Sequence, residues 1–531
     1  MEQSALWDRY KKYLYLNNTL GIYIDISRMN FSDNYFEEIK PKIETAFKDM
    51  ESLEKGAIAN PDEKRMVGHF WLRNPSLAPK PEIREEISET ILKIKEFSSK
   101  IHKGEILSST GKMFKRVLLV GIGGSALGPQ FVANALQDND TKLQISFLDN
   151  TDPDGFDRLF AKIKDELDQT IVLVISKSGG TKETSNGMEE TKEIFSKTNL
   201  TFSKHFVAIT GKYSKLHKLA LQEDWLEIFP LWDFVGGRTS ETSAVGLLPA
   251  ALQGIDIDEL LRGAKECDEQ TRRNDICQNP AAILALMWYY FTQGVGGKEM
   301  VIIPYNDRLQ LFSKYLQQLI MESLGKEKDL NDNIVNQGIA VYGNKGSTDQ
   351  HSYVQQLLDG PDNYFITFME VLKKRSKTSI ILEDKVTSGD YLHAFLLGTR
   401  NALTKKQKQS ITITVDEITP YSIGVLIALY ERAVGLYASL VNINAYHQPS
   451  VESGKKIATL TINLQKDLLS FLDNNRGKKY TPLEIATEIG QNTEIETIFK
   501  TLQHLTANMN FNVEKDNHED VFSTKYFIKA N

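Results

Sequence analysis

The sequence predicts an α/β fold with two doubly wound parallel-sheet domains, a helical N-terminal region and a small C-terminal appendage. Short apolar runs rich in β-branched residues alternate with helical patterns along most of the chain. Two of these runs, at 117–120 and 171–175, break into glycines and hydroxyl residues before the next helical pattern. In a parallel sheet such breaks lie at the carboxyl ends of strands, where ligands bind.

The predicted elements follow one another in four regions. Residues 1–110 are charged and helical in pattern, as in the amphipathic stretch at 86–97. The first α/β domain covers residues 111–255, with strands expected at 117–120, 145–148, 171–175 and 206–209. The second covers residues 256–475, with strands expected at 300–304, 364–371 and 411–415. Two similar units indicate duplication, although no residue-level repeat relates them.

The C-terminal region, residues 476–531, has a different character. Helices are expected at 481–490 and 494–506, followed by strands around Phe511 and at 522–528. This helix, helix, hairpin order is winged-helix-like, and winged helices bind DNA. Glutamates at 484, 488, 494 and 496 would oppose phosphates, which favours a packing or dimerisation role and no nucleic-acid partner.

Bulk composition narrows the class of protein. The 531-residue chain is too long for one core, and its net charge of -7 argues against nucleic-acid or membrane-surface binding by the whole molecule. Cys267 and Cys277 are too few for a disulfide framework and lack metal-ligand spacing. The N-terminus has no signal-peptide pattern, and we expect no apolar run close to the roughly twenty residues of a membrane span. A cytoplasmic protein without a membrane partner is expected.

Two loops predict a phosphate site. In the first, glycines let the backbone approach a ligand closely, and Ser125 lies where a helix N-terminus aims N–H groups at an anion. In the second, Ser176, Ser178 and Thr181 offer hydroxyls, with Lys177 as the nearest charge. The predicted ligand is a phosphorylated small molecule.

Other classes of site fit less well. Gly121, Gly123 and Ala126 satisfy the G-x-G-x-x-A pattern and Asp149 ends the next strand, so an NAD-dependent oxidoreductase stays an alternative. The second loop has no role in such a site. No metal-ligand spacing accompanies the loops, and G-x-S-x-G is absent around Ser125.

Further polar residues are candidates for chemistry. Arg238 follows two glycines, which leave room for a guanidinium to pair with an oxyanion, although a structural ion pair is the alternative. Gln318 and Glu322 lie four apart and project from one helix face, and their apolar neighbours favour a lined pocket over a solvated face.

Two more candidates are basic. His351, in a glycine-rich polar loop, can transfer a proton near its unperturbed pKa of about 6.5, or is a surface residue. Lys455 follows Gly454, and Gln448 precedes it by seven positions; a surface lysine is the alternative. Taken singly, none of these residues is decisive.

Together the motifs resemble the glucose-6-phosphate isomerase family over nearly the whole chain. They occur in the family's order: G-I-G-G-S-x-L-G at Gly121 to Gly128, S-K-x-x-x-T-x-E-T at Ser176 to Thr184, V-G-G-R at Val235 to Arg238, M-E-S-x-G-K at Met321 to Lys326, Q-H at Gln350 and His351, and [FY]-x-Q-x-x-V-E-x-G-K at Tyr446 to Lys455. The glycines at 179 and 180 and the G-N-K-G-S-T-D-Q-H loop depart from the commoner forms, and the latter resembles the bacterial and plastid-type branch.

The resemblance implies two sugar-isomerase-type domains and reversible isomerisation of glucose 6-phosphate and fructose 6-phosphate, in glycolysis and gluconeogenesis. It implies no metal or cofactor, and a homodimer in which the neighbouring subunit supplies the histidine. A non-catalytic sugar-phosphate sensor of the same fold is the alternative. The implied roles are phosphate binding by Gly124, Ser125, Ser176, Lys177, Ser178 and Thr181, sugar or phosphate contacts by Gln318 and Gln448, proton transfer by Glu322, enediolate stabilisation by Arg238, and ring opening by His351 and Lys455.

Overall fold

Two mostly parallel sheets dominate the larger part of the chain, which confirms the predicted fold class. The computed structural model describes residues 3–60 and 64–530, apart from the side chains of residues 3, 60, 451–453, 455 and 456. The chain divides into two compact units, Met1–His447 and Gln448–Asn531. Both sheets belong to the first unit.

The first sheet has five parallel strands. Their order is β6 (Gln144–Leu148), β5 (Arg116–Val120), β7 (Thr170–Ile175), β8 (Phe206–Thr210) and β9 (Glu227–Pro230). The four strands expected here are confirmed. The sequence did not predict β9, because four residues that end in proline give no periodicity to recognise.

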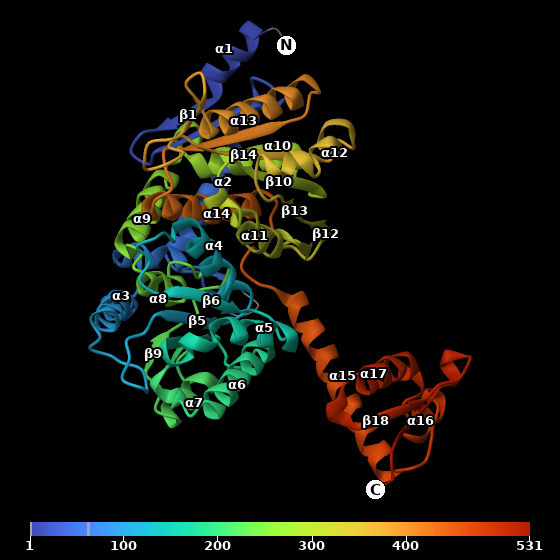
Figure 1. The fold of residues 1–531 in the computed structure, drawn as a ribbon. Helices are drawn as coiled ribbons and strands as arrows, with labels where there is room; N and C mark the ends of the chain where they lie inside the picture. The colour runs from blue at the N-terminus through green and yellow to red at the C-terminus, as the bar shows by residue number, and fades with distance from the viewer. Residues whose placement is uncertain (1–2, 61–63, 531) are drawn as a thin grey trace. The chain divides into compact units, whose positions relative to one another are not determined.

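Helices cover both faces of this sheet (Figure 1). One face carries α3 (Pro81–Lys103), α4 (Leu127–Leu136) and α8 (Ala244–Gln253), and the other carries α5 (Pro153–Ile163), α6 (Lys182–Lys197) and α7 (Lys215–Gln222). Alternate strand residues therefore enter two cores: Val117 and Ile171 join the core between the two sheets, while Leu118 and Val172 join the outer core. Burial on both faces explains why these strands are continuously apolar.

The second sheet mixes parallel and antiparallel strands. Its order is β1 (Leu14–Asn17), β2 (Ile22–Arg28), β17 (Ser410–Val415), β14 (Tyr364–Val371), β10 (Lys298–Pro304) and β13 (Ile339–Tyr342). The three expected strands, β10, β14 and β17, are confirmed, and β13 is a further short strand that runs parallel to β10.

The N-terminal region is largely helical, in α1 (Gln3–Tyr13), α2 (Tyr35–Glu54) and α3, but it is not only helical. Residues 14–28 supply β1 and β2, which extend the second sheet antiparallel to β17. Ile22, Ile24 and Ile26 alternate with other residues and are buried, which is the period of a strand. The charged surroundings masked that short alternation in the sequence.

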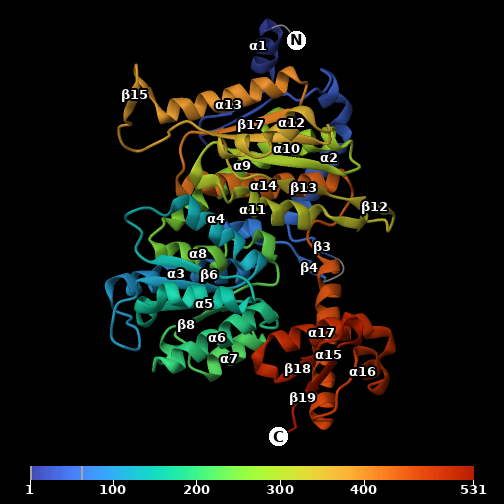
Figure 2. The same cartoon turned by 45° about the vertical axis from the view of Figure 1, so that its right-hand side comes forward.

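Helices also lie between the two sheets, as both views show (Figure 2). They include α9 (Ile257–Thr271), α10 (Pro280–Thr292) and α14 (Pro420–Leu440), and α14 packs against α2, α9 and α10. The expectation that no apolar run approaches membrane-spanning length is wrong for α14, which is long and apolar enough. However, 94% of its most apolar window is buried inside the fold, so α14 is a core helix.

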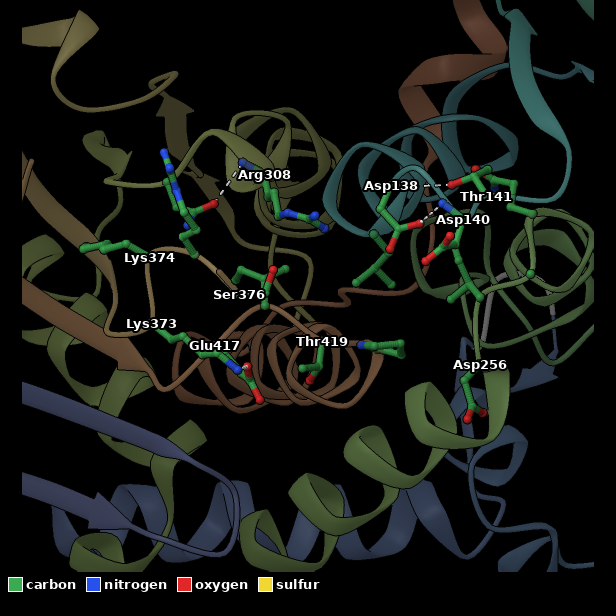
Figure 3. Close-up of a pocket in the computed structure, with 18 residues that line it drawn as sticks. Asp138, Asp140, Thr141, Asp256, Arg308, Lys373, Lys374, Ser376, Glu417 and Thr419 are labelled. Carbon is green, nitrogen blue, oxygen red and sulfur yellow. Dashed lines mark hydrogen bonds and ion pairs between the residues drawn. The ribbon is translucent and has the colours of Figure 1, made fainter. Parts of the chain in front are cut away.

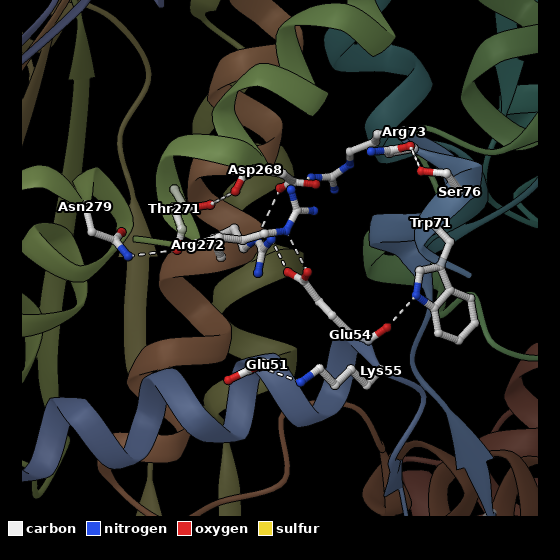
Figure 4. Close-up of polar contacts among 12 residues, drawn as sticks. Glu51, Glu54, Lys55, Trp71, Arg73, Ser76, Asp268, Thr271, Arg272 and Asn279 are labelled. Atoms are coloured by element: carbon white, nitrogen blue, oxygen red, sulfur yellow. Dashed lines mark hydrogen bonds and ion pairs between the residues drawn. The ribbon is translucent and has the colours of Figure 1, made fainter. Parts of the chain in front are cut away.

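A cluster of buried charges fixes α14 to its neighbours (Figure 4). Arg432 Nε and Arg73 Nη1 lie 3.1 and 2.9 Å from Asp268 Oδ1. Arg432 also pairs with Glu54, Arg73 with Glu431, and Arg272 Nε lies 2.7 Å from Glu54 Oε2. The cluster has three positive and three negative side chains, so the buried charges are balanced; its members are Glu54, Arg73, Asp268, Arg272, Glu431 and Arg432.

Smaller elements complete the first unit. They are α11 (Phe312–Leu316), α12 (Val354–Asp359), α13 (Ser388–Lys405) and the paired strands β3 (Ile58–Asn60) with β4 (Arg65–Met66), β11 (Lys326–Lys328) with β12 (Ile334–Gln337), and β15 (Ile381–Glu383) with β16 (Val386–Thr387). The hairpin that contains β15 projects from this unit (Figure 2).

The second unit contains the expected helix, helix and hairpin. These are α16 (Pro482–Glu488), α17 (Ile495–Ala507), and β18 (Val513–Asp516) paired antiparallel with β19 (Lys525–Ile528). The unit also includes α15 (Pro449–Asn474), which the sequence assigned to the preceding domain. The reason is packing: Leu464, Leu468 and Leu472 of α15 enter the core formed by these elements.

Replacing one arginine of the buried charge cluster tests how much the cluster contributes to stability. In Arg432→Met, Asp268 and Glu54 lose a buried partner, so we expect the free energy of unfolding to fall by about 3–5 kcal/mol. Urea unfolding followed by tryptophan fluorescence measures this, because all five tryptophans lie in the first unit.

The matched control is Arg262→Met. This arginine is 49% exposed and pairs with Glu259 and Glu266 on its own helix, so we expect a loss of about 1 kcal/mol or less. Equal losses in the two variants would show that the buried cluster has no special role.

Candidate active site

The two predicted phosphate loops lie side by side at the carboxyl ends of β5 and β7. The strand order of the first sheet reverses between these strands, since β6 follows β5 on one side and β7 lies on the other. A Cβ atom added at Gly121 would lie 3.4 Å from the Ile175 carbonyl oxygen. The loops therefore open into the crevice where α/β sheets bind their ligands.

The first loop packs against the loop that carries Arg238. The short helical turns Gly123–Ser125 and Gly237–Thr239 are in contact. A Cβ atom at Gly124 would lie only 2.1 Å from the Gly237 carbonyl oxygen. Ser240 Oγ donates to that oxygen at 2.8 Å and to the Gly124 carbonyl oxygen at 3.2 Å. Glycine at 124 is thus required by this contact between loops, a reason that the sequence does not reveal.

The second loop is ordered by its own hydroxyls. Ser176 Oγ accepts from Gly179 N at 3.1 Å, and Ser178 Oγ accepts from Gly180 N at 3.1 Å. Thr181 occupies the N-cap position of α6, where its side chain makes no capping hydrogen bond. First-turn amides of α6 are consequently left for an anion at this helix start.

Lys177 ties the second loop to the segment before Arg238. Its Nζ donates to the carbonyl oxygens of Asp233 at 2.9 Å and Val235 at 3.0 Å, and it lies 3.9 Å from the Asp233 carboxylate. The ammonium group is thereby fixed between two loops. The structure thus places a positive charge beside the second loop.

Glu322 lies at the end of a π-helical turn, Gln317–Glu322, that follows α11. This wide turn is common at functional sites. Gln318 Nε2 donates to Glu322 Oε2 at 3.0 Å, and Arg238 Nη1 lies 3.3 Å from the same oxygen. No residue that the structure describes forms a hydrogen bond or ion pair with Glu322 Oε1. The Glu322 side chain is 21% exposed. One carboxylate oxygen is held while the other is accessible.

Arg238 is buried and anchored from a third direction. Its side chain is 8% exposed, and Nη2 donates to the Ala445 carbonyl oxygen at 2.9 Å and to that of His447 at 3.4 Å. A Cβ atom at Gly123 would lie 3.2 Å from Gln318 Nε2, which places Gln318 beside the first phosphate loop. The structure thus brings Gly124, Arg238, Gln318 and Glu322 together.

Lys326 belongs to this site, although the sequence reasoning assigned it no role. Its Nζ donates to the Glu322 carbonyl oxygen at 2.7 Å, and the residue is 6% exposed. Burial, reinforced by the positive charge of Arg238 and opposed by Glu322, lowers the pKa of Lys326 to about 8. The only sequence signal was its place at the end of the M-E-S-x-G-K motif.

His351 ends a short helical turn, Thr348–His351, and its side chain is exposed. Its neighbours are well fixed: Asp349 Oδ2 accepts from Asn344 N at 2.9 Å and from Tyr353 Oη at 2.6 Å. Within the described part of the chain, no hydrogen bond or ion pair joins His351 to Glu322 or Arg238. Within the described residues of one chain, therefore, no direct polar contact links His351 to Glu322 or Arg238.

The last two candidates belong to the second unit. Gln448 is the N-cap residue of α15, and Lys455 lies on that helix, with its side chain outside the described residues. Their contribution stays a prediction.

Asp149, on which the dinucleotide alternative depended, is engaged elsewhere. Its Oδ2 accepts from Nε2 of Gln130, a residue of α4, at 2.7 Å. In the part of the chain that the structure describes, no group of three or more His, Cys, Asp or Glu side chains is arranged to hold a metal ion.

Comparison with known proteins gives one consistent family. A family model described as phosphoglucose isomerase matches residues 25–403 and 396–470. The glucose-6-phosphate isomerase of Desulfitobacterium hafniense (strain Y51) is 55% identical over 522 residues, 98% of each chain. That of Geotalea daltonii (strain DSM 22248 / JCM 15807 / FRC-32) is 56% identical over 527 residues, 99% of each chain.

A solved structure agrees with these matches. The crystal structure of a glucose-6-phosphate isomerase from Chlamydia trachomatis D/UW-3/Cx has a TM-score of 0.79 and 26% sequence identity. The alignment covers 88% of this chain and 92% of that one. The similarity therefore includes both sheets.

The lowered pKa of Lys326 predicts a pH dependence of stability. The pKa of Lys326 is about 8 in the folded chain, and the ordinary pKa of lysine is 10.5. Between these two pH values, Lys326 therefore binds more protons in the unfolded chain than in the folded chain. The free energy of unfolding therefore rises with pH in this window, by up to about 1.4 kcal/mol per unit.

Lys326→Met removes this titration. We expect the free energy of unfolding of the wild type, minus that of the variant, to increase from pH 8 to 10, as measured by urea unfolding at each pH. The exposed Lys328→Met should leave the corresponding difference constant. A constant difference for Lys326→Met as well would contradict the assignment.

Proposed function

The chain belongs to the phosphoglucose isomerase family, and on this premise we propose that Glu322 moves the proton between C1 and C2 of the substrate. The reaction is the reversible isomerisation of glucose 6-phosphate and fructose 6-phosphate, an aldose–ketose conversion. The alternative of a non-catalytic sensor is not favoured, because relatives that match over full length are named as the isomerase.

The proposal is carried by the two different environments of the Glu322 oxygens. Arg238 and Gln318 hold Oε2, so the carboxylate is oriented, and Oε1 is left to approach a substrate carbon. As base, Glu322 removes the C2 proton of the open-chain aldose and returns it to C1. The intermediate enediolate carries negative charge, and a buried guanidinium beside the base is suited to stabilise it.

The loops at 121–125 and 176–181 would anchor the phosphate. Their support is the position at the strand ends, the uncapped start of α6 and the hydroxyls of Ser125, Ser176, Ser178 and Thr181. A phosphate fixed there would place C1 and C2 beside Glu322, since remote binding energy is used for orientation. Gly124 and Lys177 would contribute backbone approach and charge.

Ring opening needs a proton donor to the ring oxygen and an acceptor for the C1 hydroxyl proton. We assign ring opening to His351 together with Lys455. We assign contacts with the sugar or its phosphate to Gln318 and Gln448. We further propose a homodimer in which His351 reaches the Glu322 site of the partner. The exposure of His351 and the lack of a polar contact to Glu322 in its own chain support this arrangement.

The setting follows from the reaction. We propose that the enzyme works in the cytoplasm, in glycolysis and gluconeogenesis, and that the chemistry requires neither metal nor redox cofactor, since a carboxylate and a fixed cation suffice.

Glu322→Gln tests the assignment of the base. The amide retains the shape and the contact with Gln318 but cannot accept the proton, so we expect kcat to fall by about 100- to 10,000-fold. A coupled assay of glucose 6-phosphate formation from fructose 6-phosphate, with EDTA present, measures turnover.

Titration with fructose 6-phosphate provides the control, because binding should persist in this variant. Full turnover by Glu322→Gln would sink the assignment. Tight binding without turnover in the wild type would instead support the sensor.

Mixing variants tests whether His351 acts across the dimer. His351→Ala and Glu322→Gln chains should each be inactive, but a mixed dimer contains one site with an intact glutamate and a partner histidine. After unfolding and refolding an equal mixture, we expect roughly a quarter of wild-type activity. Activity no higher than that of the separate variants would place both residues in the same subunit's site.

A further inference from the structure

The two sheets of the first unit share one order of strands. In the first, β5 is flanked by β6 on one side and by β7 and then β8 on the other. In the second, β10 is flanked by β13 on one side and by β14 and then β17 on the other. The order thus reverses between β5 and β7 and, equivalently, between β10 and β14. Such reversals open a crevice at the carboxyl ends of the strands, where α/β proteins bind ligands.

A cavity of about 610 Å³ lies at this position in the second sheet. It is lined by Asn306 and Arg308 after β10, by 373–376 after β14 and by 417–420 after β17. The end of α4 and residues 253–256 form the opposite side. A volume of this size suits a small-molecule ligand.

The wall that follows the strands carries four cationic side chains, Arg308, Lys373, Lys374 and Arg375. Lys373 Nζ pairs with Glu417 at 2.5 Å. Arg308 and Arg375 form no ion pair with any residue that the structure describes, whereas the Lys374 Nζ is buried and under the influence of the Glu370 carboxylate. Arg308 Nη1 donates only to the Ala135 carbonyl oxygen, at 2.9 Å. Two guanidinium groups without an ion pair at one crevice, those of Arg308 and Arg375, favour an anion with more than one charge.

The opposite wall is acidic, and two of its carboxylates accept hydrogen bonds from backbone amides. Asp138 Oδ1 accepts from Asp140 N at 2.9 Å, and Asp256 Oδ1 accepts from two amides at the start of α9. Figure 3 shows Asp138, Asp140 and Thr141 across the cavity from Arg308 and Ser376. Carboxylates in this position accept hydrogen bonds from hydroxyl groups. The ligand that matches both walls has a phosphate at one end and hydroxyls at the other.

This cavity is separate from the Glu322 site. Leu136, the last residue of α4, lines the cavity. The loop at 121–125 lies at the other end of α4, which begins at Leu127. Ten helical residues separate these ends by about 14 Å. No residue of the candidate active site lines the cavity.

We propose that the crevice at the carboxyl ends of β10, β14 and β17 is a second binding site for a small polyhydroxylated phosphate ester. Arg308 and Arg375 hold the phosphate, and Asp138 and Asp140 accept from ligand hydroxyls. The site does not depend on the assignment of the base in the Glu322 site.

Tungstate, a tetrahedral oxyanion, tests the phosphate end directly. Crystals of the full chain soaked in tungstate should show anomalous density between Arg308 and Arg375, in addition to density at the 121–125 and 176–181 loops. Density at those loops alone would overturn the proposal. This measurement needs no variant of the second site, and its outcome is independent of turnover.

Calorimetric titration tests the complete ligand class. With fructose 6-phosphate as probe and Glu322→Gln as background, we expect two sites per chain. Addition of Arg308→Met and Arg375→Met should weaken the second by at least about tenfold and leave one site measurable. Arg158→Met with Arg262→Met, two exposed arginines, is the charge-matched control and should retain two sites. One site per chain in the background itself would overturn the proposal.

Discussion

The candidate active site depends on the buried guanidinium of Arg238. It pairs with Glu322 on the π-helical turn and donates to the Ala445 and His447 carbonyl oxygens after α14. Its own loop packs against the first phosphate loop through Gly237 and Gly124. A buried cation needs several oxygen partners at once, and here those partners come from segments far apart in the sequence. One planar group thereby fixes Glu322 relative to the loops of the first sheet.

Buried ion pairs hold together the helices behind Arg238. Glu431 and Arg432 lock α14 to Arg73, Asp268 and Glu54, and α14 leads directly to the carbonyl groups that hold Arg238. A group placed by packed helices and paired charges keeps its geometry better than one on a free loop. The balanced cluster of six charges therefore helps the fold to position Arg238. Among the residues that the structure describes, no member of the cluster forms an ion pair with Arg238 or Glu322.

Sequence patterns predicted those features that depend on local order. The strand runs at 117–120 and 171–175, and the spacing of Gln318 and Glu322, are properties of short segments, and the structure contains them. Features made by tertiary contact could not be read in this way. Gly124 is required by Gly237, which is more than a hundred positions away, and Lys177 Nζ is fixed by Asp233 and Val235. Lys326 acquires its lowered pKa only when the fold buries it beside Arg238. Edge strands such as β1 and β9 are too short to show a period.

The central claim is that one carboxylate, with Oε2 held by Arg238 and Gln318, carries a proton between adjacent carbons. Isotope exchange in deuterium oxide tests it most directly. During conversion of fructose 6-phosphate by the wild type, solvent deuterium should enter C2 of glucose 6-phosphate, as detected by NMR, because the proton on a carboxylate exchanges with solvent. Glu322→Gln should abolish this incorporation. Undiminished incorporation in Glu322→Gln would contradict the account.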